Sequence, residues 1–391
     1  MEARTKIRVR ELLDEAIADG VTMGASVSVW QGGREIFYEA RGYADREKKK
    51  PIERDTIFRL YSMSKPVTAA AAMILVERGV IDLAQPVADF LPGFRELTVD
   101  CDGVIEKTDV PVTVLQLMNM TSGLSYGGEA TLSERMTSAY IDECVARLHT
   151  DHPVTTVELA NHLGTLPLLF VPDTSWRYGL SADVLGAVIE VASGMRFGEF
   201  LQKELFDRLG MADTGFWVPG SKQDRLACAY ESVGDGTMTP YTGDNLAVQN
   251  TMAEPPAYEA GGAGLVSTLP DYARFTQMLL NGGMLDGIRV LSETSVRFLT
   301  SGRLTDVQQR EFRKWVGLEG FSYSHLMRVM QEPGMANLIG CTGEYGWDGW
   351  LGCYFTNIPE KNMTILLMQQ KKDAGTIPMT RKIRNVILAG Q

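Results

Sequence analysis

An uncharged apolar stretch near residue 70 constrains the fold more than any other feature of the chain. Between Lys65 and Glu77 the sequence reads "PVTAAAAMILV", with no charged residue. A helix that is apolar on every side must be buried. The sequence therefore predicts a buried central helix that begins close to Ser62.

Ser62 and Lys65 form a Ser-x-x-Lys pattern at the N-terminal end of this helix. A spacing of three residues is close to one helical turn, so the lysine ammonium can reach the serine hydroxyl. Burial lowers the pKa of a lysine, and a neutral amine can accept the serine proton. The following Pro66 fits the first turn of a helix. The pattern predicts a nucleophile and its base, and the alternative is an N-cap serine followed by a surface lysine.

A second candidate serine, Ser125, lies in the Gly-x-Ser-x-Gly pattern "GLSYG". A nucleophile elbow requires a strand before the serine and a helix after it. Residues 113–120 instead have helical spacing, with Thr113 as a plausible N-cap, and a glycine-rich loop follows Ser125. A triad in the order Ser-Asp-His would also need a late histidine, and only His325 qualifies. We expect Ser125 to lie in a loop, which leaves an α/β-hydrolase as the less favoured alternative.

Both ends of the chain show the patterns of strands. Residues 25–45 predict a hairpin around Gln31–Arg34. Residues 346–370 predict two strands around a turn at residues 359–362. An amphipathic helix over residues 6–19 is predicted to open the chain.

Helical patterns dominate the middle of the chain, from about residue 82 to residue 215. A sheet made of both chain ends, with a helical region inserted between them, is the simplest arrangement. We therefore predict an α+β fold in which an antiparallel sheet is flanked by helices. Residues 1–81 and 216–391 are expected to form its α/β domain, and residues 82–215 a mainly helical domain.

Charge and composition exclude several kinds of partner. The net charge is −11 at pH 7, whereas nucleic acids and anionic membranes require a basic face. No run approaches the roughly 18 apolar residues that span a bilayer, and the charged N-terminus lacks the apolar core of a signal peptide. The five scattered cysteines and four histidines show no metal-ligand spacing. We expect no metal, no cofactor and a reducing, cytoplasmic location.

Five segments, in this order along the chain, resemble the serine β-lactamase and penicillin-binding protein superfamily. They are "FRLYSMSKPVTAAAAMILVERG", "LQLMNMTSGLSYG", "WRYGLSADVLGAVIEVASG", "AGGAGLVSTLPDYARFTQMLLNGG" and "GWDGWLGCYF". The resemblance is strongest to the class C-like branch that contains the family VIII carboxylesterases and related acyltransferases. It covers nearly the whole chain and implies a β-lactamase/transpeptidase-like fold.

The resemblance assigns roles to individual residues. Ser62 would be the acylated nucleophile, with Lys65 as its base or proton shuttle. Tyr178 would be a second general acid/base, and a nearby cation such as Lys65 would have to lower its pKa from the ordinary value of about 10. The backbone N–H groups of Ser62 and Trp350 would form the oxyanion hole. Tyr126 would be a wall of the acyl pocket.

Two motifs depart from the pattern of the β-lactamases. The second motif begins at Tyr178 and reads "YGL", so it lacks the asparagine that contacts the amide of a β-lactam. The third motif reads "WDG", from Trp347 to Gly349, and places a tryptophan where a lysine would hold a substrate carboxylate. Both differences favour neutral esters bound in an apolar pocket by the third-motif residues. Within that motif, Asp348 either faces away from the site or attracts a substrate amine.

These observations predict a serine carboxylesterase, or an acyltransferase, that acts on a small-molecule ester through an acyl-enzyme on Ser62. A β-lactamase, a DD-peptidase or a D-aminopeptidase/amidase of the same superfamily is the first alternative. A penicillin sensor that is acylated without turnover is an alternative from a different class. The sequence leaves the acyl chain length, the acceptor and the oligomeric state open.

Overall fold

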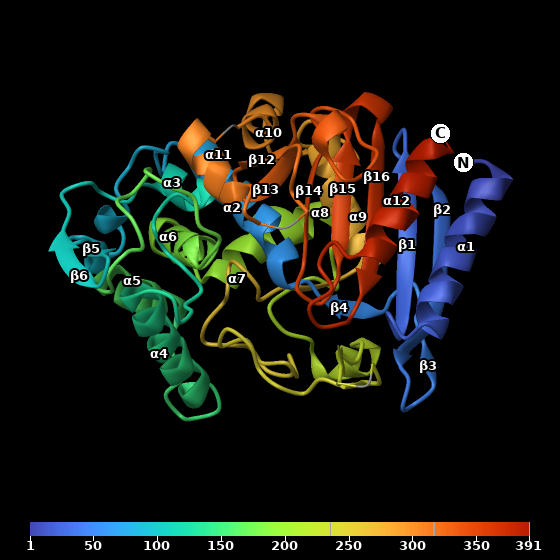
Figure 1. Ribbon diagram of the computed structural model, residues 1–391, viewed down its shortest axis with the longest axis horizontal. Coiled ribbons are helices and arrows are strands. Elements are labelled where there is room, and N and C mark those ends of the chain that lie inside the picture. The colour runs from blue at the N-terminus through green and yellow to red at the C-terminus, as the bar shows by residue number, and fades with distance from the viewer. Residues whose placement is uncertain (235, 303, 316, 391) are drawn as a thin grey trace.

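An eight-stranded antiparallel sheet organises the fold (Figure 1). The computed structural model describes residues 1–234, 236–302, 304–315 and 317–390. In spatial order the strands are β12 (Phe321–Ser324), β13 (Met327–Met330), β14 (Tyr345–Asp348), β15 (Tyr354–Ile358), β16 (Met363–Gln369), β1 (Gly24–Gln31), β2 (Arg34–Asp45) and β3 (Lys50–Pro51). The two ends of the chain meet where β1 pairs with β16. The predicted α+β fold, with an antiparallel sheet built from both chain ends, is confirmed.

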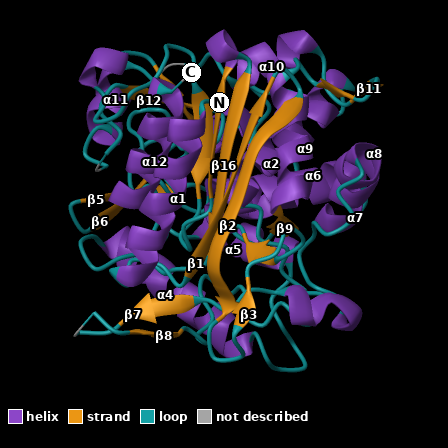
Figure 2. Cartoon of the chain, turned by 90° about the vertical axis from the view of Figure 1, so that its right-hand side faces the viewer, coloured by secondary structure: helices purple, strands orange, loops and turns teal. Residues whose placement is uncertain are grey.

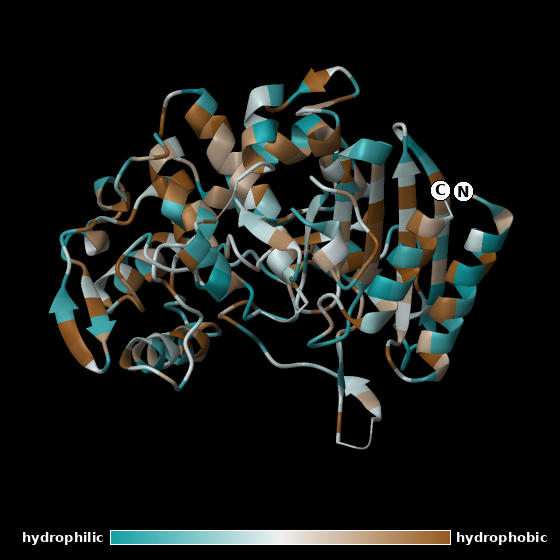
Figure 3. Ribbon diagram, turned by 45° about the horizontal axis from the view of Figure 1, so that its top comes forward, coloured by the Kyte–Doolittle hydropathy of each residue, from teal (hydrophilic) through white to brown (hydrophobic). Residues whose placement is uncertain are grey.

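Helices cover both faces of this sheet. On one face lie α1 (Ala3–Ala18) and α12 (Pro378–Ala389), and on the other α9 (Leu269–Leu280) contacts β15 and β16, as Figure 2 shows. Side chains alternate along β16, so Ile365 joins the core under α1 and α12 whereas Leu366 joins the core around α9. In Figure 3 the helices beside the N and C labels, α1 and α12, show hydrophilic and hydrophobic residues in alternation along the ribbon. This alternation is expected of helices that bury one face.

Helix α2 (Ser64–Glu77) is the buried central helix that the sequence predicts. Every side chain from Ser64 to Leu75 is buried. It contacts α6 (Ser181–Ser193) and α10 (Glu293–Leu299). The absence of charge in the middle of α2 is therefore explained by packing on every side.

Most of the remaining helices fall between residues 82 and 215, as predicted. The helices are α3 (Val114–Asn119), α4 (Leu132–Arg147), α5 (Thr156–Thr165), α7 (Phe197–Leu201), a π-helical turn (Gln202–Phe206), α8 (Asp207–Leu209) and, later in the chain, α11 (Asp306–Phe312). Their buried side chains share one continuous core with α2, so the division into two domains stays a prediction. In the part of the chain that the structure describes, no helix is both long and apolar enough to cross a membrane.

Small two-stranded sheets complete the fold. They are β4 (Ile57–Arg59) with β9 (Val266–Thr268), β5 (Thr98–Cys101) with β6 (Val104–Lys107), β7 (Tyr230–Ser232) with β8 (Met238–Pro240), and β10 (Met284–Leu285) with β11 (Ile288–Arg289). The β4–β9 pair matters most for function, because β4 leads directly toward Ser62 and α2.

The C-terminal strands differ in number from the prediction. Three strands (β14, β15 and β16) lie where two are expected, although the turn at residues 359–362 correctly separates the last two. A tight turn ends β14, in which the Gly349 N–H donates to the Cys353 carbonyl oxygen at 2.7 Å. Asp348, Gly349 and Gly352 mark this turn in the sequence, but the prediction takes residues 346–358 as one strand. The hairpin of β12 and β13 is also absent from the prediction.

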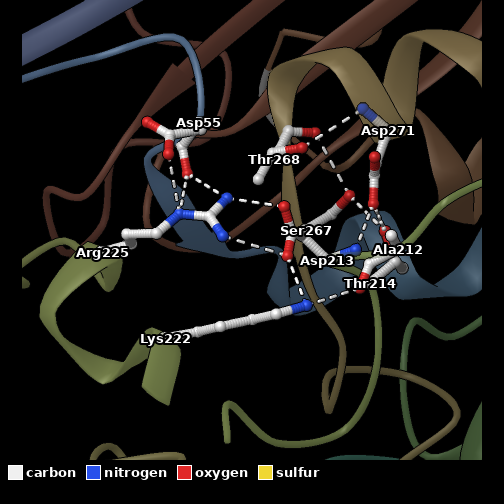
Figure 4. Close-up of polar contacts among 9 residues, drawn as sticks. All are labelled: Asp55, Ala212, Asp213, Thr214, Lys222, Arg225, Ser267, Thr268 and Asp271. Atoms are coloured by element: carbon white, nitrogen blue, oxygen red, sulfur yellow. Dashed lines mark hydrogen bonds and ion pairs between the residues drawn. The ribbon is translucent and has the colours of Figure 1, made fainter. Parts of the chain in front are cut away.

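A polar network fixes the segment after α8 to the start of α9 (Figure 4). Asp213 pairs with Lys222 at 2.7 Å and with Arg225 at 2.5 Å, and Arg225 also pairs with Asp55. In the first turn of α9, Asp271 accepts a hydrogen bond from the Asp213 N–H at 2.7 Å. Asp271 is buried, so it is a carboxylate whose hydrogen bonds hold the fold together.

Candidate active site

A sharp turn places Ser62 at the entrance to α2. Strand β4 ends at Arg59, and a 3-10 turn over Tyr61–Met63 leads into the helix. Tyr61 has a φ of 45°, in the left-handed region that residues other than glycine rarely occupy. Backbone strain of this kind clusters at functional sites. Ser62 itself opens into a cavity of about 420 Å³.

Lys65 is fully buried beside Ser62. Its Nζ lies 3.1 Å from Ser62 Oγ, 2.8 Å from the Tyr126 hydroxyl and 2.8 Å from the carbonyl oxygen of Gly262. Burial lowers the pKa of Lys65 to about 7, although two carboxylates oppose this effect. A large fraction of the lysine is therefore neutral at neutral pH, and its lone pair can accept a hydroxyl proton. The structure brings Ser62 and Lys65 together as the sequence predicts.

Tyr178 belongs to the same site, but its pKa moves opposite to the prediction. Its hydroxyl accepts a hydrogen bond from Trp347 Nε1–H at 2.9 Å, and Tyr178 lines the same cavity as Ser62. Burial raises the pKa of Tyr178, whereas the sequence predicts a lowered pKa. Lys65 does not offset the burial, because its pKa of about 7 leaves it uncharged at the pH where a tyrosine loses its proton. Tyr178 therefore stays a neutral hydroxyl that can donate a proton.

Tyr126 lies closer to the chemistry than the wall of a pocket would. Its hydroxyl contacts Lys65, and its ring packs edge-on against Tyr178 with the ring centres 5.6 Å apart. Burial raises the pKa of Tyr126 well above its ordinary value. The site thus holds two neutral tyrosine hydroxyls around one lysine that can lose its proton.

Replacing Trp347 with phenylalanine should lower kcat for ester hydrolysis by roughly ten-fold, because a lost hydrogen bond to a buried polar group costs about 1–3 kcal/mol. The buried Trp347 donates its only N–H to the Tyr178 hydroxyl, so the variant leaves that hydroxyl without its donor. Steady-state kinetics would measure the loss. Trp350→Phe is the matched control, since the indole Nε1–H of Trp350 donates to Asp373 and not to Tyr178. Equal losses of kcat in the two variants would contradict the positioning of Tyr178 by Trp347.

Asp348 lines the cavity, but its charge is already paired. Its carboxylate lies 3.6 Å from the guanidinium of the buried Arg328 and accepts a hydrogen bond from the Thr376 hydroxyl. Asp348 is among the residues that line the cavity, and the interpretation that its side chain faces away from the site stays a prediction. A substrate amine would have to compete with both partners, so the structure disfavours the interpretation that Asp348 attracts an amine.

The end of β14 lies directly against the residues that precede Ser62. A Cβ on Gly349 would lie 2.1 Å from the carbonyl oxygen of Leu60, so this close approach requires glycine. Gly349 and Trp350 line the cavity together with Ser62. This placement suits the oxyanion hole expected from the N–H groups of Ser62 and Trp350, which stays a prediction.

Ser125 lies in a loop, as predicted. The helix α3 precedes it, and not a strand; a capping box at Thr113 begins this helix. The Ser125 Oγ accepts the N–H of Gly127 at 3.1 Å within the same loop. The ring of His325 lies 2.8 Å from Ser324 Oγ, and burial lowers its pKa to about 4. These contacts give no support to a nucleophile elbow at Ser125.

Several residues that line the cavity lie outside the sequence motifs used to predict the site. Trp315 packs against Tyr178 with the ring centres 4.8 Å apart, and the cavity is also lined by Tyr61, Asn245, Leu246, Leu318 and Thr376. These residues come from segments far apart in the sequence, and no periodic pattern marks them. Within the described ranges, no group of three or more His, Cys, Asp or Glu residues could hold a metal ion.

Comparison with known proteins finds relatives along the full length of the chain. The profile of the family "Beta-lactamase" matches residues 9–386. Protein Rv1367c of Mycobacterium tuberculosis is 32% identical over 93% of this chain and 88% of its own. Esterase EstB of Burkholderia gladioli is 30% identical over 98% of this chain and 95% of its own. The solved structure of "EstCE1, a hydrolase with promiscuous acyltransferase activity" has a TM-score of 0.83, with 25% identity over 98% of both chains.

Proposed function

Because the chain belongs to the Beta-lactamase family, we propose that it cleaves carboxylic esters through an acyl-enzyme on Ser62 and passes the acyl group to water or an alcohol. The chain is a serine ester hydrolase of this superfamily, as its similarity to Esterase EstB and to the hydrolase EstCE1 supports. The observation that carries the assignment of Ser62 is its 3.1 Å contact with the Nζ of the buried Lys65. That contact joins a nucleophile to a base.

In the acylation step, Ser62 Oγ attacks the ester carbonyl while its proton passes to the neutral Lys65. The carbonyl oxygen gains negative charge, which the N–H groups of Ser62 and Trp350, two residues that line the cavity, would stabilise. The bond to the leaving alkoxide then breaks. The alkoxide takes the proton of the Tyr178 hydroxyl, and the Lys65 ammonium then gives its proton to the tyrosine oxygen. Both residues are neutral again, and no tyrosinate accumulates.

Deacylation uses the same groups in reverse order. Water or an alcohol enters the cavity, gives its proton to Lys65 and attacks the acyl carbon. Ser62 Oγ leaves the acyl carbon and regains a proton from the lysine ammonium. The hydrogen bond that Lys65 Nζ donates to the Tyr126 hydroxyl oxygen, at 2.8 Å, keeps the amine in place through both steps.

The lining of the cavity favours a neutral, apolar substrate. Trp315, Trp347 and Trp350 line it together with Leu246 and Leu318. The one acidic group in the lining, Asp348, is already paired with Arg328. Apolar walls with few polar groups favour binding of an ester over a charged peptide.

Covalent labelling tests the nucleophile. The protein would be treated with a serine-reactive fluorophosphonate, and the modified peptide would be mapped by mass spectrometry. We expect the label on Ser62. Label on Ser125, or none on intact and folded protein, would overturn the proposal.

Three substrates compared side by side test the reaction class. We expect a short-chain ester to be hydrolysed much faster than a chromogenic cephalosporin or a D-amino-acid amide. Faster turnover of the cephalosporin or the amide would favour the corresponding alternative enzyme. A stoichiometric burst without steady turnover would favour a penicillin sensor.

The pH dependence of ester hydrolysis should report Lys65. Burial lowers the pKa of this lysine to about 7, and only the neutral amine can accept the Ser62 proton. We therefore expect kcat/KM to rise with pH through about 7 and then to level off. Measurements from about pH 5 to 9, with folding followed by tryptophan fluorescence, would show this. A rise centred near the ordinary lysine value of about 10 would contradict it.

A further inference from the structure

Asp183 is a buried carboxylate that the catalytic steps above leave unused. It lies on α6 and is 2% exposed. One of its oxygens, Oδ1, accepts hydrogen bonds from the Tyr258 hydroxyl at 2.7 Å and from the Gly262 N–H at 3.0 Å. The other oxygen, Oδ2, is buried without a hydrogen-bond partner. A half-satisfied buried carboxylate is costly, so its presence requires an explanation.

Gly262 joins this carboxylate to the catalytic lysine. The carbonyl oxygen of Gly262 accepts from Lys65 Nζ at 2.8 Å, while its N–H donates to Asp183. A Cβ on Gly262 would lie 2.5 Å from Asp183 Oδ2, and a Cβ on Gly261 would lie 2.3 Å from the Ala182 carbonyl oxygen. The two glycines therefore let this loop press against α6. They bring the Gly262 backbone between the carboxylate and Lys65, and Asp183 is not among the residues that line the cavity.

The other groups that face Lys65 do not compensate its charge. Asp348 is paired with Arg328. The hydroxyls of Tyr126, Tyr178 and Tyr258 are neutral, because burial raises their pKa values. Among the described residues around Lys65, Asp183 is thus the acidic group that has no cation other than the lysine.

We propose that Asp183 is the counter-charge of Lys65, held behind it by Gly262 and Tyr258. It stabilises the ammonium that forms when Lys65 accepts the Ser62 proton, and no bond to Asp183 forms or breaks. Asp183 is a positioning residue, because it does not line the cavity. The inference rests on the proposed function of Ser62 and Lys65.

The charge of Asp183 should affect how ester hydrolysis depends on pH. A nearby negative charge raises the pKa of a lysine. Asp183 and Asp348 both raise the pKa of Lys65, and Asp183 has the larger effect. Removing this charge makes Lys65 a weaker base that loses its proton at lower pH. The rise of kcat/KM should move to lower pH, and kcat at high pH should fall, while KM should change little.

Asp183→Asn tests this expectation, because asparagine keeps the shape and the accepting oxygen but removes the charge. We expect the rise of kcat/KM with pH to move down by about one unit. We expect kcat on the plateau to fall by up to about ten-fold, the change in basicity that one pKa unit represents. Asp271→Asn is the matched control: Asp271 is also buried, but it accepts from Asp213 and Thr214. Its pH profile should match that of the wild type.

Each outcome decides the question. A profile of Asp183→Asn that superimposes on the wild type, or an equal shift in both variants, would overturn the inference. Neither result would affect the labelling of Ser62, so the proposed function would stand. If Asp183→Asn does not fold, Tyr258→Phe removes one donor to the carboxylate and leaves its negative charge less compensated. That variant should shift the profile in the opposite direction, to higher pH, by a smaller amount. An unshifted profile in that variant would then overturn the inference.

Discussion

Ser62→Ala should abolish ester hydrolysis, with a loss in kcat of about 10⁴-fold or more, as expected when a nucleophile that acts together with its base is removed. Ser62 Oγ is the atom that the proposed acyl-enzyme forms on, and Lys65 Nζ lies 3.1 Å from it. The change removes one atom at the edge of a cavity, so the fold should persist. Single-turnover and steady-state assays on the same ester would measure the loss, and circular dichroism would verify folding.

Ser125→Ala is the matched control for this experiment. The substitution removes the same hydroxyl group, but the Ser125 Oγ only accepts the N–H of Gly127 within its own loop. The variant should keep most of the activity. Loss of activity in Ser125→Ala but not in Ser62→Ala would return the assignment to a nucleophile elbow.

Arg384→Met should lower the free energy of unfolding by about 3–5 kcal/mol, the cost of leaving one charge of a buried ion pair without its partner. Arg384 on α12 lies 2.7 Å from both carboxylate oxygens of Glu344, and each side chain is 1% exposed. The pair ties α12 to the segment that leads into β14. Urea unfolding followed by tryptophan fluorescence would measure the change.

An exposed ion pair provides the control for Arg384. Arg297 and Glu293 are four residues apart on α10, with 69% and 75% of their side chains exposed. Arg297→Met should change stability by less than about 0.5 kcal/mol, as is usual for pairs in water. Similar effects of the two substitutions would mean that water reaches Glu344. If the large effect comes from the unpaired carboxylate, Glu344→Gln added to Arg384→Met should recover part of the loss.

The protonation states of the site give Lys65 and Tyr178 different tasks. The two residues are fully buried, and burial disfavours the charged form of each. It therefore lowers the pKa of Lys65 to about 7 but raises that of Tyr178. Lysine becomes the group that can accept a proton at neutral pH, while tyrosine remains a donor. The sequence-based expectation of a lowered tyrosine pKa fails because it considers the nearby cation and not the burial.

Close packing explains the glycine of the second motif. The second motif has Gly179 after Tyr178. A Cβ on Gly179 would lie 2.5 Å from the carbonyl oxygen of Leu124 and 2.6 Å from the Cα of Ser125. The loop of Ser125 thus packs on the catalytic tyrosine segment, and glycine makes room for it. The Gly-x-Ser-x-Gly pattern belongs to this packing and not to a nucleophile.

The sequence by itself determined those features that depend on neighbours along the chain. One helical turn between Ser62 and Lys65 fixes their proximity, and an uncharged run after Lys65 requires that the helix be buried. Strand patterns around turns at both chain ends indicated a shared sheet, although the turn signals after β14 were not used. The places of Tyr178 and Trp347 in the site followed only from resemblance to a family.

Only the tertiary structure decided the electrostatics of the site. Asp348 is paired because Arg328 lies on the neighbouring strand β13, and Asp183 reaches Lys65 because the Gly262 backbone lies between them. These partners are brought together by folding from segments that are distant in sequence. Electrostatic interaction acts over a few ångströms of space and strengthens with burial. A sequence pattern fixes neither the distance nor the burial, so it could name the catalytic groups but not their charges.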